Sequence, residues 1–224
     1  GMAMKNILKI MLMMITIFTI AGSAVYAAEI PVSDQDQLIT SSDWTEISNL
    51  QDEMKKEEPD ATIDYDKALK VYVDCNLIKL QTADTKKLTS ALESANYVWV
   101  IPFKMEKTYG MFTVAKGLPL SEEAKSVLTK AEQEEVKNHA GKWMITETAE
   151  HTVEPYYDIL LEKREALSDC TRVVLVGSQP GMRQPVALGM DDETARIWIS
   201  LGYQYPVMEK IPETQNVESG VYSF

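Results

Sequence analysis

The sequence predicts an α+β fold, in which a mixed or mainly antiparallel sheet of six or seven strands packs on about four helices. Apolar residues recur with a period of two in several short segments and at helical spacing in others, so strands and helices interleave along the chain. The segments 97–103 and 173–176 are apolar on both faces, which is typical of strands that are covered on two sides. The hydrophobic share of 45% and the charged share of 25% are those of an ordinary globular protein.

The segment 1–27 has the three-part organisation of a secretory signal peptide. Lys5 and Lys9 precede the apolar run 10–20, and a Val-Tyr-Ala sequence ends at Ala27. We therefore expect cleavage after Ala27 and a secreted or extracellular protein. The alternative is an uncleaved leader that tethers the chain to a membrane. Gly1, ahead of the first methionine, is expected to be left from cloning.

Removal of this leader leaves the segment 28–224 with 20 basic and 34 acidic side chains, a formal charge of −14. Such acidity argues against nucleic acid as a partner, because phosphate binding uses clustered Lys and Arg. It is compatible with plain solubility outside the cell, with metal cations and with basic peptides. No stretch after Ala28 reaches the ~18 apolar residues that span a bilayer, so we expect no membrane span after cleavage.

Residues 28–41 are polar and without a period, which predicts a flexible lead-in. A first α/β half is expected over 42–118. Its helices begin at 42–43 and 84–85, where Ser, Asp and Thr side chains can cap the first-turn amides, and the first helix ends before Pro59. Strands are predicted at 67–75, 97–103 and 109–115.

A second α/β half is expected over 119–205. Its first helix follows the N-cap Ser121, carries two glutamates in its first turn and ends before Gly141. The core face predicted for this helix consists of Ala124, Val127, Leu128 and Ala131. A second helix is predicted at 155–167, strands at 142–148, 172–177, 184–189 and 194–201, and a loose surface tail at 206–224.

The spacing of the strands raises the hypothesis of an internal duplication. Strand starts at 67, 97 and 109 recur at 142, 172 and 184, with the same offset between the members of each pair. The alternative is that any α+β chain alternates its elements at such intervals.

Cys75 and Cys170 are the two cysteines of the chain, and export permits an oxidised pair. A disulfide would close a loop of about 95 residues and stabilise the fold by roughly 4 to 5 kcal/mol. The alternative is two buried thiols, since cysteine is among the most buried residue types. Neither cysteine has an evident basic neighbour that would make it a nucleophile.

Several motifs of common enzymes are missing. The sequence has no Gly-rich phosphate loop, no G-x-S-x-G elbow, no H-E-x-x-H and no C-x-x-C. His139 and His151 are its two histidines, so a catalytic triad or a multi-histidine metal site has little to build from. We therefore expect no cofactor, no metal and no catalytic residue of these classes.

The loop 177–185 is the most distinctive stretch, because its two glycines and two prolines fix unusual backbone geometry. Gln179, Arg183 and Gln184 present donors there that suit a carboxylate or a peptide backbone. The alternative is an ordinary hairpin connection.

An aromatic surface is the second candidate for binding. Arg196 and Trp198 share the outward face of the last predicted strand, where they would form a platform for a sugar ring or for a partner's side chains. The alternative is that a helix covers this face and that Trp198 belongs to the core.

Two functions follow from these observations. The first is an exported, non-catalytic binding protein for an unknown protein, peptide or glycan, which uses the loop 177–185, the Arg196 and Trp198 face, or a groove between the two halves near residue 119. The second is a secreted hydrolase that draws on a carboxylate pair from Glu147, Glu150 or Glu154, which lie close to His151. The alternative for this acidic cluster is a solvated loop.

Overall fold

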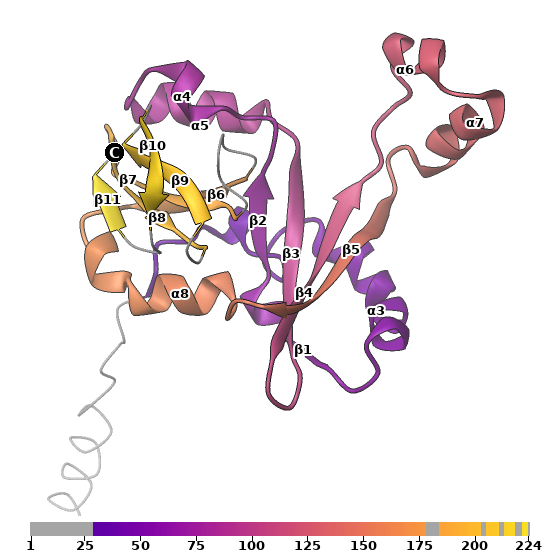
Figure 1. The fold of residues 1–224 in the computed structure, drawn as a ribbon, viewed down its shortest axis with the longest axis horizontal. Helices are drawn as coiled ribbons and strands as arrows, with labels where there is room; N and C mark the ends of the chain where they lie inside the picture. Colours follow the sequence, from indigo (N-terminus) through magenta and orange to yellow (C-terminus); the bar gives the residue numbers. More distant parts are fainter. Residues whose placement is uncertain (1–28, 178–183, 203–204, 211–212, 218–220, 224) are drawn as a thin grey trace, which may run out of the picture.

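The computed structural model describes residues 29–177, 184–202, 205–210, 213–217 and 221–223. It confirms the α+β fold, since nine strands form one mixed, mostly antiparallel sheet and helices lie on both of its faces (Figure 1). The seven strands expected from the sequence are all present in this sheet, as strands β2 to β8.

The strand order of the sheet is β11-β8-β7-β6-β2-β3-β4-β5, and the short β1 pairs with β3. β2 and β6 run parallel, whereas the other neighbours in this order are antiparallel. β9 and β10 form a separate antiparallel pair. The strands are β1 (Thr62–Ile63), β2 (Leu69–Tyr72), β3 (Tyr97–Lys104), β4 (Tyr109–Lys116), β5 (Trp143–Thr152), β6 (Arg172–Val176), β7 (Val186–Met190), β8 (Ala195–Ser200), β9 (Tyr205–Lys210), β10 (Glu213–Val217) and β11 (Val221–Ser223).

Two of the helix starts predicted from the sequence carry the expected capping side chains. Asp84 accepts a hydrogen bond from the Lys87 amide at 2.9 Å, and Ser121 accepts one from the Ala124 amide at 3.0 Å, as expected for N-caps. The helices are α2 (Trp44–Ile47), α3 (Gln51–Glu57), α4 (Leu77–Leu80), α5 (Thr85–Glu93), α6 (Glu122–Val127), α7 (Lys130–His139) and α8 (Tyr156–Glu162), with short 3-10 turns η1 (Asp34–Asp36), η2 (Ser48–Leu50), η3 (Tyr65–Lys67) and η4 (Arg164–Leu167).

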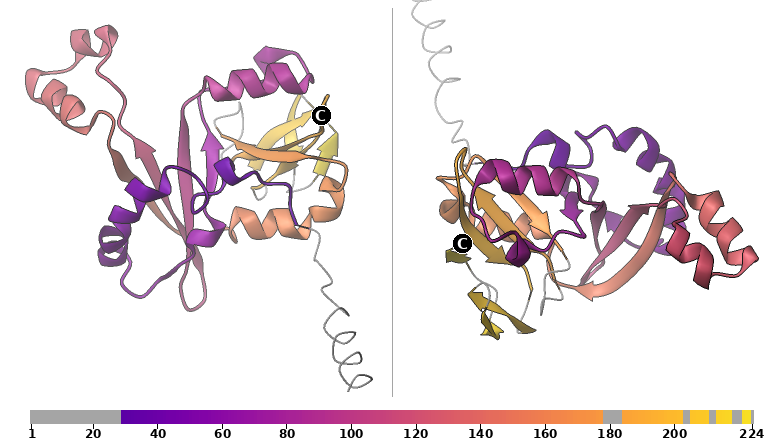
Figure 2. Two further views of the ribbon diagram at one scale, coloured as in Figure 1. Left: turned by 180° about the vertical axis from the view of Figure 1, so that it is seen from behind. Right: turned by 90° about the horizontal axis from the view of Figure 1, so that it is seen from above.

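Alternation along the strands divides the interior into three clusters. Val173 and Leu175 of β6 pack on one face with α8, in a cluster named here the α8 core, and Val174 and Val176 pack on the other face with α4 and α5, in the α5 core. On the same face as the α5 core, α2 and α3 cover the β3, β4 and β5 end of the sheet and form the α3 core. Figures 1 and 2 show α5 and α8 on opposite sides of the sheet.

The N-terminal segment differs from the flexible lead-in expected for 28–41. Leu38 is fully buried and Ile30 is 6% exposed, and Gln37 forms a β-bridge with Leu69. Apolar residues placed singly among polar ones have no period, which is why the pattern did not predict this packing. The segment is part of the fold.

The helix expected after Ser121 is broken into α6 and α7. Leu128 and Thr129 have extended backbone between them, and Thr129 starts α7 with a capping box in which Glu132 accepts from the Thr129 amide. The predicted core face is wrong, because neither helix has a buried residue and Val127 is 79% exposed.

The strand order repeats only in part between the two halves predicted from the sequence. β3 and β4 are antiparallel neighbours, as are the corresponding β6 and β7, but β2 and β3 are neighbours whereas the corresponding β5 and β6 are not. The region expected as a loose tail contains β9, β10 and β11.

Cys75 and Cys170 lie on opposite faces of the sheet. Cys75 packs in the α5 core and Cys170 in the α8 core, so no disulfide joins them in this structure. Both are buried, and burial raises the pKa of each thiol. The arrangement matches the alternative of two buried thiols.

A charged network fastens the N-terminal segment to β2 and β6. The Asp36 carboxylate, 3% exposed, accepts from Arg172 Nε at 3.0 Å and Nη2 at 3.2 Å, from the Tyr72 hydroxyl at 3.1 Å and from Ser33 Oγ at 2.6 Å. Burial, followed by the charge of Asp36, raises the pKa of Tyr72 to about 12, so this hydroxyl stays a donor at physiological pH.

The Asp36→Asn variant tests this network. It keeps the shape of the side chain but leaves the half-buried Arg172 guanidinium without its counter-charge, so we expect a loss of about 3 kcal/mol in the free energy of unfolding. Urea denaturation at neutral pH measures the loss. Asp34→Asn, at an exposed position of the same turn, is the control and should change stability by less than about 0.5 kcal/mol. Equal effects of the two variants would contradict the role of Asp36.

Candidate functional site

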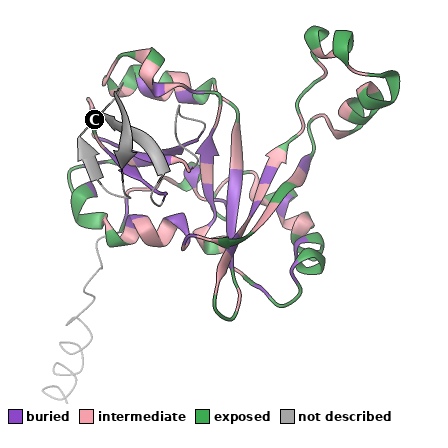
Figure 3. Cartoon of the chain, in the orientation of Figure 1, coloured by how far each residue is buried: buried purple, intermediate pink, exposed green. Residues whose placement is uncertain are grey.

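A helical arm, residues 118–140, leaves the sheet between β4 and β5 and carries α6 and α7. Figures 1 and 2 show it projecting away from the rest of the molecule, and Figure 3 shows only exposed and intermediate residues along both helices. Leu118 at its start is 56% exposed. Leu118 and Val127 of the arm are two of the three large hydrophobic side chains that are exposed among the described residues.

Two glycines hold the base of the arm together. The Gly117 amide donates to the Lys142 carbonyl at 2.9 Å, and the Gly141 amide donates to the Gly117 carbonyl at 2.8 Å. A Cβ at Gly117 would lie 2.0 Å from the backbone oxygen of His139, so only glycine allows this approach. Gly141 has a φ of +73°, the left-handed conformation that commonly follows a helix.

Two adjoining pockets meet at this base and share the segment 117–119. The first, the aromatic pocket, has a volume of about 320 Å³ and is bounded by Tyr97, Trp143 and Lys116. The second, the arm pocket, has a volume of about 640 Å³ and lies between α6, α7 and Met144 of β5. Both volumes are in the range of sites that take ligands or side chains of a partner, roughly 300–1,000 Å³.

The wall of the aromatic pocket belongs to a packed cluster of rings. The ring centroid of Tyr97 lies 5.9 Å from that of Trp143, 6.1 Å from Trp99 and 6.2 Å from Tyr72. Lys70 Nζ lies 4.2 Å from the Tyr97 centroid, within cation–π distance. Burial is the main cause of a lowered pKa at Lys70.

Hydrogen bonds fix the two central rings. Asp43 accepts from the Tyr97 hydroxyl at 2.7 Å and from Trp99 Nε1 at 3.0 Å. Burial, followed by the hydrogen bond to Asp43, raises the pKa of Tyr97. Asp43 therefore serves the aromatic cluster, although the sequence predicted it as an N-cap, and α2 has no side-chain cap. The Tyr97 hydroxyl in the pocket wall is therefore already paired.

The arm pocket has an apolar interior and acidic side chains. One face of α7 lines it with residues at positions i, i+3, i+4 and i+7, which are Glu132, Glu135, Val136 and His139. Leu128 and Ala124 of α6 line it from the other side. The hydrogen bond from the Thr129 amide lowers the pKa of Glu132, so this carboxylate is charged at neutral pH.

Three of the five binding residues predicted from the sequence, Gln184, Arg196 and Trp198, lie within the described residues. Gln179 and Arg183 lie outside the described residues. Gln184 is half-buried and accepts a hydrogen bond from the Tyr156 hydroxyl. Arg196 is exposed and pairs with Asp191 at 3.0 Å.

The predicted aromatic platform is corrected by the position of Trp198. This ring is 2% exposed and packs in the α5 core. Helices α4 and α5 cover its face of the sheet, which is the alternative that the sequence left open. Trp198 therefore does not form an exposed platform with Arg196.

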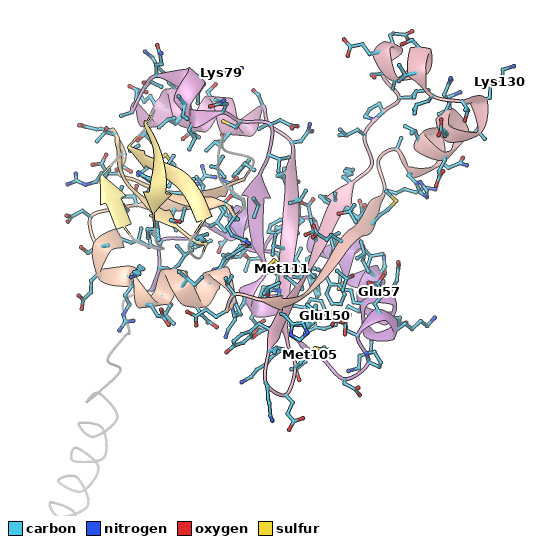
Figure 4. All side chains as sticks on the ribbon, viewed as in Figure 1. Glu57, Lys79, Met105, Met111, Lys130 and Glu150 are labelled. Carbon is cyan, nitrogen blue, oxygen red and sulfur yellow. The ribbon has the colours of Figure 1, made fainter. Side chains whose placement is uncertain are left out.

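The carboxylates proposed for a hydrolase are separated. In the register of β5 with β4, Glu150 pairs with Gly110 and Glu147 with Thr113, so the two glutamates point to opposite faces. Glu150 lies next to Glu58, at the end of α3, and Glu147 lies on the side of Tyr156. Figure 4 labels Glu150 on β5 and Glu57 at the end of α3.

The remaining members of the acidic cluster are also apart. Glu154 is next to Glu162 of α8, and its pKa is raised mainly by burial. His151 is exposed at a positive φ of 56°. Among the described residues, no three His, Cys, Asp or Glu side chains are arranged to hold a metal ion.

The sequence contains one signal for the break between α6 and α7, although the helical spacing of the apolar residues continues across it. Thr129-Lys130-Ala131-Glu132 is a capping box, which marks a new helix start inside the predicted helix. With that break, Val127 and Ala131 no longer share one continuous apolar face with Ala124 and Leu128.

The contact between α3 and β5 yields a pH-dependent prediction. A hydrogen bond with Glu150, followed by burial, raises the pKa of Glu58. The folded state therefore holds this proton more tightly than the unfolded state, so the stability that Glu58 contributes is complete below its unfolded pKa and is lost as pH rises through its folded pKa.

We expect Glu150→Gln to raise the free energy of unfolding at pH 7, because an amide donor replaces a second carboxyl group beside Glu58. The gain should shrink at pH 4, where Glu58 is protonated in the folded wild type. Denaturant melts at both pH values measure it. Glu147→Gln, on the opposite face of β5, should give no such pH-dependent gain. A gain of equal size at pH 4 and pH 7 would rule out the carboxyl pair.

Gly117→Ala tests the base of the arm. The added methyl group would collide with the His139 backbone, so the return of α7 to β5 must shift. We expect faster amide exchange throughout α6 and α7 with unchanged protection of β6 and β7, measured by hydrogen–deuterium exchange. Lys116→Ala, at the exposed neighbouring position, is the control. Unchanged exchange in α7 would show that Gly117 does not position the arm.

Comparisons with known proteins found no matching family model, no matching curated protein and no matching solved structure. No helix within the described residues is long and apolar enough to cross a membrane. A function for this chain has to be argued from its own geometry.

Proposed function

We propose that this chain is an exported, non-catalytic binding protein that holds a protein or peptide partner with its arm and the two pockets at the arm's base. The observation that carries the proposal is the ordered but uncovered arm. Neither α6 nor α7 has a buried residue, and Leu118 and Val127 are 56% and 79% exposed.

The energetics of short helices support this role. Helices of six and ten residues are marginal when isolated, and in proteins they are stabilised by packing of an apolar face. The arm orders a helical pair without gaining that burial. A partner that covers its apolar side chains would gain about 25 cal/mol for each Å² of apolar surface removed from water.

The positions of the acidic residues favour binding over carboxylate hydrolysis. A glycosidase needs two carboxyl groups on opposite sides of one bond, about 5 to 10 Å apart. Glu147 and Glu150 instead point away from each other across β5, and Glu150 and Glu58 share a hydrogen bond, which leaves no room for a scissile bond between them. Around the aromatic pocket, the carboxylate of Asp43 is engaged by Tyr97 and Trp99.

The proposed binding surface differs from the one predicted from the sequence. The burial of Trp198 removes half of the Arg196 and Trp198 face. The two pockets share residues 117–119, close to residue 119, where the sequence places a possible groove between the two halves.

Site-specific photo-crosslinking tests the proposed function. The full chain, with a photoreactive side chain in place of Val127, is irradiated in the culture of the cells that produce it. We expect an adduct of one defined mass. A photoreactive side chain in place of Lys86, exposed on α5, is the control and should not give that adduct. No adduct at Val127, or the same adducts at both sites, would contradict binding through the arm.

A further inference from the structure

The arm pocket is an incomplete helical core. Leu120 and Leu128 enter it from the α6 side and Val136 from α7, and all are half-buried. Two helices bury little apolar surface by themselves, whereas a third helix laid against them completes a small bundle. The volume of about 640 Å³ accommodates several apolar side chains of one helix face.

The charges around this pocket are asymmetric. Lys125 and Lys137, on the two helices of the arm, are each paired within the arm, with Glu122 at 2.6 Å and Glu134 at 3.2 Å. Glu135 lines the pocket and, within the described part of the chain, forms no ion pair. No lysine or arginine of the described residues, including Lys130 of α7, lines the pocket, so its lining carries the negative charge of Glu132 and Glu135.

The charge of the whole chain restricts the occupant. A second copy would bring another net charge of −12 toward this surface, and a nucleic acid or an anionic membrane would be repelled in the same way. A sugar ring would need an open aromatic platform, but Trp143 in the neighbouring pocket is 8% exposed. A helix with one apolar face and lysine or arginine beside it satisfies both the apolar interior and the acidic side chains.

Resting on the proposed function, we infer that the arm pocket takes a basic amphipathic helix of the partner protein. The apolar face of that helix fills the space between α6 and α7, and its basic side chains lie beside Glu135 and Glu132. The inference specifies the chemistry of the partner, which the proposed function leaves open.

A pair of synthetic peptides tests this chemistry with the full chain. The first peptide has about 18 residues, five helical turns, with Leu at i, i+3, i+4 and i+7 and Lys on the flanks of the Leu face. The second has Glu in place of every Lys. Fluorescence anisotropy at low salt measures binding. We expect the basic peptide to bind and the acidic peptide not to bind, and we expect added salt to weaken the basic complex. Equal binding of both peptides, or binding of neither, would overturn the inference.

Two charge-reversal variants locate the binding surface. Glu135→Lys changes a residue that lines the pocket, and Glu134→Lys makes the same change in net charge at the next residue, which does not line it. We expect Glu135→Lys to weaken binding of the basic peptide by about fivefold or more and Glu134→Lys to have a smaller effect. Equal weakening would show that the peptide responds to overall charge and not to the pocket. Both positions are exposed, and the exposed ion pair with Lys137 that Glu134→Lys also removes contributes little to stability, so neither variant threatens the fold.

Leu128→Asp tests the apolar interior and should abolish binding. Circular dichroism and hydrogen–deuterium exchange of α7 establish whether the arm keeps its helices in this variant. Retained binding with an intact arm would overturn the inference.

Failure of the inference is distinguishable from failure of the proposed function. If the crosslinker at Val127 still captures a partner while the basic peptide does not bind, the arm is a binding surface but its partner is not a basic helix. If both experiments are negative, both proposals fall.

Discussion

The pairing of Asp36 with Arg172 holds together the two parts of this sheet. β2 to β5 form one antiparallel meander and β6 to β8 form another, and the parallel contact of β2 with β6 joins them. That contact has only two residue pairs in register, Val71 with Leu175 and Tyr72 with Val176. A junction of this length would supply few hydrogen bonds between two meanders that each pair well internally.

The N-terminal segment strengthens this junction from the other end. The Val173 amide of β6 donates to the Pro31 carbonyl at 2.8 Å, and the Leu38 amide donates to the Ala68 carbonyl, beside β2, at 3.1 Å. Asp36 lies between these two contacts and binds Arg172 of β6 and Tyr72 of β2 through one carboxylate. Because a buried charge without its partner is costly, the network fixes the segment in one position.

Much of the fold was predictable because it is encoded locally. Alternation between apolar and polar residues identified the seven central strands, and short capping side chains such as Asp84 and Ser121 marked helix starts. These signals depend on residues within a few positions of one another. The strand order depends on contacts between distant segments, such as β2 with β6, and no local pattern reports them.

The site was harder to predict because burial of polar and aromatic residues is a tertiary property. The alternation along β8 shows that Arg196 and Trp198 share a face, but α4 and α5, which cover Trp198, come from a different part of the chain. Asp43 has the residue type of an N-cap, yet Tyr97 and Trp99 reach it from β3, a strand much later in the sequence. Much of the polar chemistry that a sequence suggests as functional is used here for packing.

The location of the arm separates binding from folding. It is inserted between β4 and β5, at the opposite end of the strand order from β8, so the junction of β2 with β6 lies outside it. Gly117 and Gly141 confine the connection to one narrow base, and the packed rings of Tyr97 and Trp143 lie beside that base. Neither helix of the arm has a buried residue, so a partner bound to α6 and α7 would stabilise the arm by mass action, while the sheet keeps the stability of its own cores.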